Sequence, residues 1–317
     1  ASNAKVSERL QNEFEKHSVK SAAFRSMQAG RSALPIFDQR ANILEALEQY
    51  DALVVSGETG SGKTTQVPSY ILEEAICDGW GADCRIVCTQ PRRISAVSIA
   101  RRVREELGLG QSGGGDRKRR GQQQRGRGGR GGTLPAEIRE LVGHHIRGER
   151  TATAATRLTF CTTGVLLRQL QSDAQLAHLT HIIVDEVHER SMQSDFLLVA
   201  LRRLAVTRRS EYNAWRRLPS VKKGGGPPPP PPPLKVILMS ATVDEERLAS
   251  YFRECAIVSA SGRTFPVRVH YLEDVVEATG YACELDSQYT RRDVRAKQRN
   301  AARAQTVHVT GAGGHSH

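Results

Sequence analysis

The segment GETGSGKT at 57–64 constrains the fold more than any other stretch of this 317-residue chain. It fits the pattern G-x-x-x-x-G-K-[ST], follows the apolar run ALVVSG at 52–57 and precedes a helical pattern. Glycines let the backbone curl so that successive N–H groups face phosphate oxygens, and the following helix adds its positive end. The sequence of strand, turn and helix predicts a phosphate-binding P-loop, the alternative being an ordinary glycine-rich turn.

Eight residues of this loop are predicted to bind a nucleotide. They are Gly57, Thr59, Gly60, Ser61, Gly62, Lys63, Thr64 and Thr65. Lys63 would place a positive charge near the β- and γ-phosphates, and the Thr64 hydroxyl is a predicted Mg²⁺ ligand. Together they indicate ATP or a related nucleotide with Mg²⁺.

A second motif, HIIVDEVHER at 181–190, ends an apolar strand with two adjacent carboxylates. Ligands bind open α/β sheets at the carboxyl ends of strands, where these acids are expected. Asp185 would hold Mg²⁺ through its water shell, and Glu186 would polarise the attacking water. Nucleotide hydrolysis needs both a phosphate cradle and a metal carboxylate, so each motif supports the other. The alternative is a solvated acidic loop.

Short apolar runs alternate with helical patterns along most of the chain. The predicted strands are 52–57, 84–90, 157–162, 180–186 and 234–241, and the predicted helices include 38–50, capped by Asp38, 94–107 and 194–205. Runs that are apolar throughout are typical of parallel strands buried on both faces. The alternation therefore predicts an α/β fold with a doubly wound, mostly parallel sheet.

Two segments that lack a core-forming composition are predicted to be disordered insertions outside the sheet. The Gly/Arg-rich insertion at about 111–134 carries seven basic residues and one acid, about half of the chain's net charge of +12. Such a tract either binds RNA weakly through charge and arginine stacking or acts as a passive linker. The Pro-rich insertion at 219–234 is predicted to be a spacer, with an SH3- or WW-type ligand as the alternative.

Composition excludes several classes of protein. No run of about 18 apolar residues is present, and the polar N-terminus resembles neither a signal nor a transit peptide, so no membrane or secreted location is expected. The six cysteines lack C-x-x-C spacing, which favours structural thiols over a zinc site, with Cys88 and Cys161 in apolar runs. A cytoplasmic or a nuclear location remains open, and the basic charge suits a polyanion.

Five motifs in a fixed order resemble the DEAH/RHA family of superfamily 2 RNA helicases. They are GETGSGKTTQ at 57–66, TQPRR at 89–93, TTGVLLR at 162–168, the DExH box DEVH at 185–188, and SAT at 240–242. The resemblance covers about 35–290 and is greatest to the branch that contains the ribosome-associated scanning helicase. It implies a RecA-like domain that uses ATP and Mg²⁺ and binds mainly single-stranded RNA, as part of a ribosomal or other ribonucleoprotein complex.

The resemblance also implies roles for residues outside the P-loop. Asp185 and Glu186 bind metal and activate water, and His188 couples the nucleotide site to a second domain. Ser240 and Thr242 link hydrolysis to strand movement, and Arg102 stacks on the base, with loose nucleotide selectivity. Each role has an alternative. His188 could be a loop histidine, and Ser240 and Thr242 could cap a turn. Arg102 could be one more charge on an exposed helical face.

The RNA-contacting residues implied by the resemblance are Arg92, Arg93, Thr162 and Gly164, although the two arginines also suit a solvated helix start. Three residues depart from the family pattern: Val187 in the box, His144 where an aromatic is usual, and Gly148 where a bulkier residue is usual. Val187 is a mild change, whereas His144 and Gly148 leave the RNA-side structure of their segment open.

The tract QRGRGGR at 124–130 is similar to the family's arginine-finger motif Q-R-x-G-R-x-G-R, but Arg127 replaces its first glycine. It also precedes the DExH box, whereas the finger motif follows it. The expected organisation is an N-terminal helical extension at 1–35, the RecA-like domain at 36–272, and a linker with a basic tail at 273–317. With the second RecA-like domain absent, this chain alone is expected to hydrolyse ATP poorly.

Two other functions compete with an ATP-dependent RNA helicase. One is an RNA-binding or scaffold module that keeps a nucleotide-binding fold without effective hydrolysis. The other is a DNA helicase or a different P-loop motor. The intact P-loop and DExH box count against the scaffold module. Only the resemblance to RNA helicases distinguishes this chain from a DNA helicase or another P-loop motor.

Overall fold

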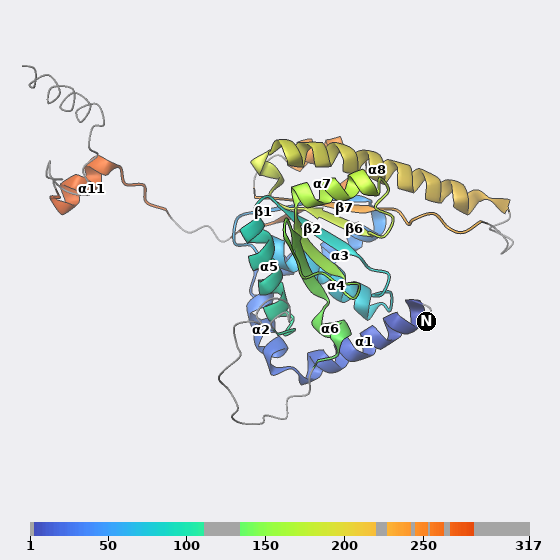
Figure 1. Cartoon of the computed structure of the whole chain (residues 1–317). Helices are drawn as coiled ribbons and strands as arrows, with labels where there is room; N and C mark the ends of the chain where they lie inside the picture. Colours follow the sequence, from blue (N-terminus) through green and yellow to red (C-terminus); the bar gives the residue numbers. More distant parts are fainter. Residues whose placement is uncertain are drawn as a thin grey trace, which may run out of the picture. The chain divides into compact units, whose positions relative to one another are not determined.

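The computed structural model describes residues 3–110, 134–219, 227–241, 245–252, 254–262 and 267–281. The chain divides into two compact units, Ala1–Arg263 and Thr264–His317. The described part of the second unit contains helix α11 (Leu272–Thr279), which ends at Gly280 in the left-handed conformation. All other elements belong to the first unit (Figure 1). The domain boundaries expected at 35/36 and 272/273 stay predictions.

Eight strands of the described chain form one sheet, in the order β4-β3-β5-β2-β6-β7-β1-β8. Every neighbouring pair is parallel except β3 and β4. The strands are β1 (Ala52–Gly57), β2 (Ile86–Gln90), β3 (Val142–Ile146), β4 (Glu149–Arg150), β5 (Leu158–Thr162), β6 (His181–Val184), β7 (Lys235–Ser240) and β8 (Cys255–Ala260). The predicted doubly wound, mostly parallel sheet is confirmed, and each of the five predicted strands is present.

The strands are apolar throughout because the sheet is buried on both faces. In β1, Leu53 and Val55 face one core cluster, whereas Ala52 and Val54 face the other. This alternation follows from the two-residue period of a strand. The strands that the sequence analysis missed lie toward the edges of the sheet, where β3 contains two histidines and β8 is partly exposed.

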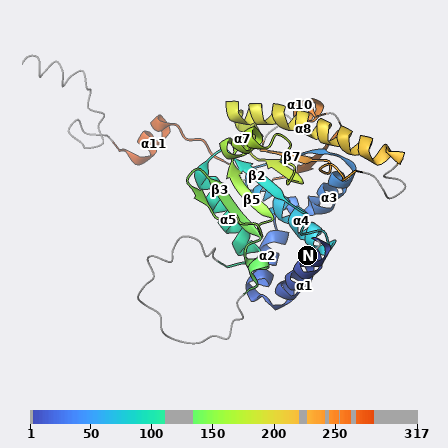
Figure 2. The ribbon, with the colours of Figure 1, turned by 45° about the vertical axis from the view of Figure 1, so that its right-hand side comes forward.

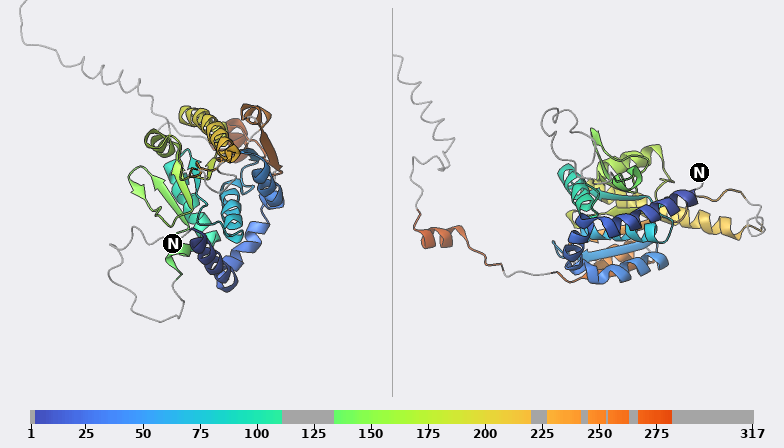
Figure 3. Two further views of the ribbon diagram at one scale, coloured as in Figure 1. Left: turned by 90° about the vertical axis from the view of Figure 1, so that its right-hand side faces the viewer. Right: turned by 90° about the horizontal axis from the view of Figure 1, so that it is seen from below.

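Helices cover both faces of the sheet (Figures 1 and 2). One face carries α1 (Asn3–Lys20), α2 (Ala22–Ser32), η1 (Pro35–Gln39), α3 (Arg40–Gln49), α4 (Lys63–Cys77), α5 (Arg93–Glu106) and α6 (Ala136–Arg139). The other carries α7 (Thr163–Ser172), η2 (Val187–Glu189), α8 (Met192–Arg217) and α10 (Glu245–Tyr251). Figure 3 shows the two layers end-on.

Asp38 does not cap α3, so that prediction was wrong. It lies inside η1, and α3 begins at Arg40 after Gln39, whose side chain makes no capping hydrogen bond. Pro35 explains the difference, because its fixed φ favours the first helical position and starts a tight turn earlier. Helix α8 is longer than predicted and begins after Ser191, whose hydroxyl accepts from the Ser194 N–H at 3.1 Å.

Most of the Gly/Arg-rich insertion, 111–133, lies outside the described residues, as does 220–226 of the Pro-rich insertion. The described prolines at 227–233 form no strand and lie next to α8. The indole N–H of Trp215 donates to the Pro227 carbonyl at 2.8 Å, and the buried Arg208 guanidinium donates to the Pro232 carbonyl at 2.9 Å. This end of the Pro-rich insertion is therefore tied to α8.

Three cysteines lie in the core, among them Cys88 and Cys161 as predicted. Burial raises the pKa of the Cys161 thiol to about 12 and that of Cys88 well above its usual range, so both act as small apolar groups. Among the described residues, no helix combines the length and apolar character needed to cross a membrane.

His181 should make the stability of this domain pH-dependent. Its ring stacks on Trp80, and burial, followed by the charge of Lys235, lowers its pKa from 6.5 to about 3. Between these values the unfolded chain binds a proton that the folded chain does not. The contribution of His181 to the free energy of unfolding is therefore fully present above pH 6.5. It decreases below that pH, by up to about 1.4 kcal/mol per pH unit.

Urea unfolding at several pH values measures this slope. His181→Gln should flatten it between pH 6.5 and 4.5, whereas replacing the exposed His178 by Gln should leave it unchanged. An unchanged slope in the His181 variant would contradict the assignment.

Candidate nucleotide-binding and hydrolysis site

The predicted catalytic motifs meet at the carboxyl ends of three neighbouring strands inside the sheet. The P-loop connects β1 to α4, the DExH box follows β6, and Ala241 follows β7. These strands are neighbours in the order β6-β7-β1 and run parallel, so their carboxyl ends lie together. Thr64 and Asp185, which are 121 residues apart in the sequence, are thereby in direct contact.

Glycines of the P-loop adopt backbone conformations that L side chains rarely take. Gly60 has φ +86° and Gly62, immediately before α4, has φ +95°. A Cβ on Gly62 would also lie 2.8 Å from the Leu34 Cδ1 atom, so the Leu34 side chain would have to shift, in addition to the strain of the positive φ. The loop is thus held in the curled form that turns its N–H groups toward a phosphate.

Lys63 is the first residue of α4 and is only 7% exposed. Its ammonium donates to the carbonyl of Gly57, to the Glu58 carbonyl at 3.0 Å and to the Ser61 hydroxyl at 3.3 Å. Burial lowers its pKa, against the charges of Asp185 and Glu186, which raise it. A charged amine that is buried among neutral carbonyls is well placed to bind an anionic phosphate.

Asp185 accepts three hydrogen bonds that fix both of its oxygens. The Thr64 hydroxyl and the Gln90 amide each donate to Oδ2 at 2.7 Å, and the Glu186 N–H donates to Oδ1 at 2.9 Å. Burial raises its pKa, while the bonds from Gln90 and Thr64 lower it. Gln90 was not predicted as a site residue. Its position at the carboxyl end of β2, the strand beside β6, could have indicated that it lies near Asp185.

Glu186 has a left-handed backbone, with φ +54°, that is unusual for a residue other than glycine. Such strain is concentrated at functional sites. Burial, and then the charge of Asp185, raise the pKa of its carboxyl group. A carboxylate whose pKa is shifted toward neutrality is a better proton acceptor near neutral pH.

His188 connects the ends of β6 and β7. Its Nδ1 atom lies 3.4 Å from the Glu186 Oε2 atom and accepts from the Ala241 N–H at 3.3 Å. Ser240, the predicted coupling residue at the end of β7, is buried. Its predicted partner Thr242 lies outside the described residues.

A pocket of about 280 Å³ opens beside the P-loop. Its lining includes Thr59, Gly60, Gly62, Lys63, Thr64, Thr65, Glu186 and Arg102, all predicted site residues. Arg102 lies on α5 and donates through Nε to Glu106 Oε1 at 2.7 Å. Leu34 and Glu106 line the pocket as well and were not predicted. Neither belongs to a sequence motif, so their place at the pocket follows only from the packing of α5 and of the segment after α2.

The predicted RNA-contacting residues follow two neighbouring strands. Thr162 ends β5 and pairs in register with Gln90 of β2, which places it beside the TQPRR segment, and Gly164 lies in the first turn of α7. Arg92 and Arg93, at the start of α5, are exposed. Arg92 contacts Glu189 of η2 at 3.2 Å.

The β3–β4 hairpin accommodates two of the departures from the family pattern. His144 is buried in β3, and its ring contacts Glu149 at 2.9 Å and Thr151 at 3.2 Å. Gly148 lies in the turn with φ +86°, a conformation that favours glycine. The third departure, Val187, is buried behind the DExH box.

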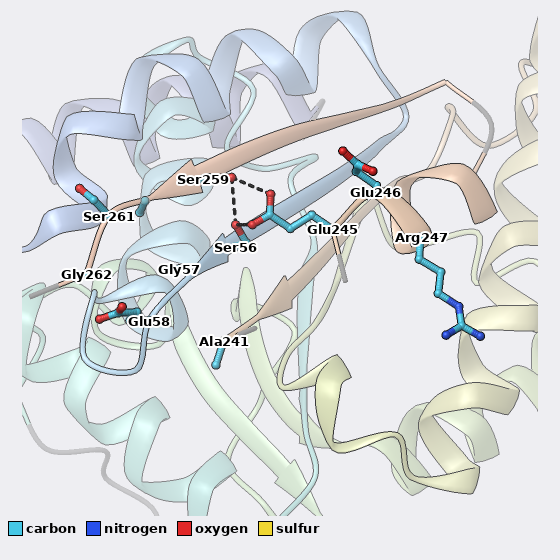
Figure 4. Close-up of a pocket in the computed structure, with 11 residues that line it drawn as sticks. Ser56, Gly57, Glu58, Ala241, Glu245, Glu246, Arg247, Ser259, Ser261 and Gly262 are labelled. Carbon is cyan, nitrogen blue, oxygen red and sulfur yellow. Dashed lines mark hydrogen bonds between the residues drawn. The ribbon is translucent and has the colours of Figure 1, made fainter. Parts of the chain in front are cut away.

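A second cavity of about 900 Å³ is lined by residues that include Ser56, Gly57 and Glu245 (Figure 4). Glu245 of α10 accepts from the hydroxyls of Ser56 and Ser259, the latter at 2.7 Å, and so connects α10 to β1 and β8.

The parallel sheet and the phosphate loop define a RecA-like P-loop domain. The chain belongs to the DEAD/DEAH box helicase family, whose profile matches residues 37–250.

Curated relatives support this assignment. The chain is 43% identical over 310 residues to the ATP-dependent RNA helicase dhx29 of Xenopus laevis, which covers 98% of the chain and 19% of the relative. It is 45% identical over 263 residues to human ATP-dependent RNA helicase DHX29, covering 83% of the chain and 16% of the relative. The chloroplastic helicase DExH4 of Arabidopsis thaliana is 42% identical, with coverage of 83% and 16%. The chain thus spans less than a fifth of the length of these relatives.

Proposed function

We propose that this chain is the ATP-binding part of an ATP-dependent RNA helicase that couples hydrolysis to movement along single-stranded RNA. The observation that carries this proposal is the hydrogen bond between Thr64 and Asp185, because it joins the phosphate loop to the DExH box next to the buried Lys63. The relatives are named as ATP-dependent RNA helicases, which supports the same function.

The site suits Mg²⁺. The metal prefers oxygen ligands and is usually held by one or two carboxylates together with substrate phosphates and waters. Asp185 and Thr64 present a carboxylate and a hydroxyl oxygen 2.7 Å apart. When bound, Mg²⁺ would neutralise charge that develops on the phosphates.

The protein's own groups have separate tasks in hydrolysis. Lys63 binds the β- and γ-phosphates, and the P-loop N–H groups orient them. Glu186 orients the attacking water and accepts its proton, which its raised pKa favours. His188 contacts Glu186 and the Ala241 N–H, so it connects the hydrolytic carboxylate to the segment after β7. Arg102 and Leu34 accommodate the base without reading its identity, which predicts loose nucleotide selectivity.

RNA is proposed to bind across the carboxyl ends of β2 and β5. Arg93 is exposed there and donates to the Arg147 carbonyl at 3.0 Å, which holds the guanidinium near the surface. Through the ion pair of Arg92 with Glu189, this surface is connected to η2 and the DExH box. A ribosomal or other ribonucleoprotein complex is the proposed partner.

Arg93→Ala should weaken binding of single-stranded RNA uniformly across sequences. Loss of one phosphate contact should also reduce the slope of log affinity against log salt by about 0.7. Fluorescence anisotropy with two RNAs of different sequence, at several salt concentrations, measures both effects. Arg203→Ala, an exposed arginine on α8 outside the motifs, is the control. An unchanged salt slope would contradict the placement of RNA.

The proposed function is tested by the ATPase activity of the longer protein that contains this chain, with single-stranded RNA, with single-stranded DNA and with neither. Stimulation by RNA supports the helicase, and equal stimulation by DNA favours another nucleic-acid motor. ATP binding without turnover in all three conditions would favour the scaffold module.

A further inference from the structure

A buried chain of polar side chains runs from the N-terminal helices to the nucleotide pocket. Arg31 on α2 donates through Nε to the Gln66 Oε1 atom at 2.8 Å. Gln66 on α4 donates through Nε2 to the Glu106 Oε2 atom at 2.7 Å. Glu106 on α5 accepts from Arg102 at 2.7 Å through its other oxygen. These four residues, which we call the relay, cross three helices.

The interior of the relay is closed to water. Arg31 is 3% exposed, Gln66 0% and Glu106 2%, whereas the Arg102 side chain is 55% exposed at the pocket. Buried polar groups are costly unless they are hydrogen-bonded, and satisfied networks are rigid. The hydrogen bonds of Gln66 and Glu106 therefore hold these two side chains in one arrangement, and Arg102 is the exposed member that can meet a ligand.

The chemistry of Gln66 gives the relay a direction. A guanidinium only donates hydrogen bonds and a carboxylate only accepts them, so a group between them must do both. The Gln66 amide does so, and its Nε2 atom also donates to the Thr65 hydroxyl at 2.8 Å. The relay therefore touches the P-loop side of the pocket as well as Arg102.

The N-terminal segment makes two other contacts at or near this pocket. A ring nitrogen of His17 on α1 lies 2.9 Å from the carbonyl oxygen of Leu107, the residue after Glu106. Leu34, which follows α2, lines the pocket directly. Helix α2 thus packs against α5, and the segment that follows α2 forms part of the pocket wall through Leu34.

We propose that the relay orients Arg102, so that the N-terminal helices set how tightly the pocket holds the base of the nucleotide. This inference rests on the proposed function, since it needs a nucleotide in the pocket. A guanidinium stacks on flat π-systems, and its contribution depends on its orientation. In this arrangement Glu106 and Arg31 are positioning residues, because they act through Arg102.

Arg31 also contacts Glu73 of α4. The Arg31 Nη2 and Glu73 Oε1 atoms lie 2.7 Å apart as an ion pair, but their geometry is not that of a hydrogen bond. The bond to Gln66 is therefore the directional contact of Arg31. Removing Arg31 alone would leave the Glu73 charge buried without a partner, so a test replaces both residues.

The first test compares ATP with inorganic tripolyphosphate, which lacks a base and a sugar, in titrations of this chain with Mg²⁺. Glu106→Gln keeps the side-chain size but offers one acceptor oxygen instead of two. It should weaken ATP binding about tenfold and leave tripolyphosphate binding unchanged. The double variant Arg102→Ala with Glu106→Gln should bind ATP as weakly as the single variant Arg102→Ala, because both residues act through one contact.

The second test starts from α2. Arg31→Met combined with Glu73→Met should weaken ATP binding about fivefold, again without affecting tripolyphosphate. Glu74→Gln is the matched control, since Glu74 lies next to Glu73 on α4 and pairs with Arg40 outside the relay. It should bind both ligands as the wild type does.

The outcomes separate the two proposals. If the wild-type chain binds neither ligand, the proposed nucleotide function fails and the relay with it. If the wild type binds both, but the relay variants weaken both equally or weaken neither, the relay is overturned and the nucleotide site stands.

Discussion

Replacing Lys63 by alanine should lower the affinity of this chain for Mg²⁺–ATP by on the order of 10²-fold. Lys63 is the buried cation of the P-loop, and losing one partner of a buried charge pair costs about 2–5 kcal/mol. The variant should stay folded, because the carbonyls that the ammonium contacts can bind water in the emptied space.

Isothermal titration with ATP measures this change, and circular dichroism confirms the fold. Lys16→Ala, an exposed lysine on α1, serves as the control and should bind like the wild type. ATP binding that survives Lys63→Ala within threefold would remove the P-loop from the nucleotide site.

Glu186→Gln should separate binding from hydrolysis. The amide keeps the size of the side chain but does not accept the proton of the attacking water, and general-base catalysis contributes roughly 10²–10⁴-fold. Hydrolysis in the longer protein with RNA should fall by about that factor, while ATP affinity should change less than about threefold.

Single-turnover kinetics and an ATP titration measure the two quantities separately. Glu105→Gln, an exposed carboxylate on α5, is the control for charge removal near the site. A parallel loss of binding and turnover in the Glu186 variant would assign Glu186 to substrate binding instead of water activation.

The relay connects the N-terminal helix α2 to α4 and α5 beside the nucleotide pocket. Leu10 and Phe14 of α1 belong to the same core cluster as the strands, so α1 is part of the folded unit. Through Arg31 and Leu34, the segment after it reaches the nucleotide pocket from outside every sequence motif.

Local sequence patterns were sufficient for the elements that carry the chemistry. The glycines of the P-loop, the apolar run before them and the helix after them are adjacent in the sequence, so their geometry follows from local backbone preferences. The carboxylates of the DExH box are likewise fixed at a strand end, and the continuous apolar strands imply burial on both faces.

Which side chains of the site touch one another could not be predicted, because these contacts join residues that are distant in the sequence. The contact of Thr64 with Asp185 across 121 positions requires the order β6-β7-β1, which no local pattern specifies. The same holds for Gln90 as a third partner of Asp185 and for Glu106 behind Arg102. The identities and local order of the residues specify which chemical groups the site contains. The packing of strands and helices determined which of them touch, since register and layer contacts are set by the whole core.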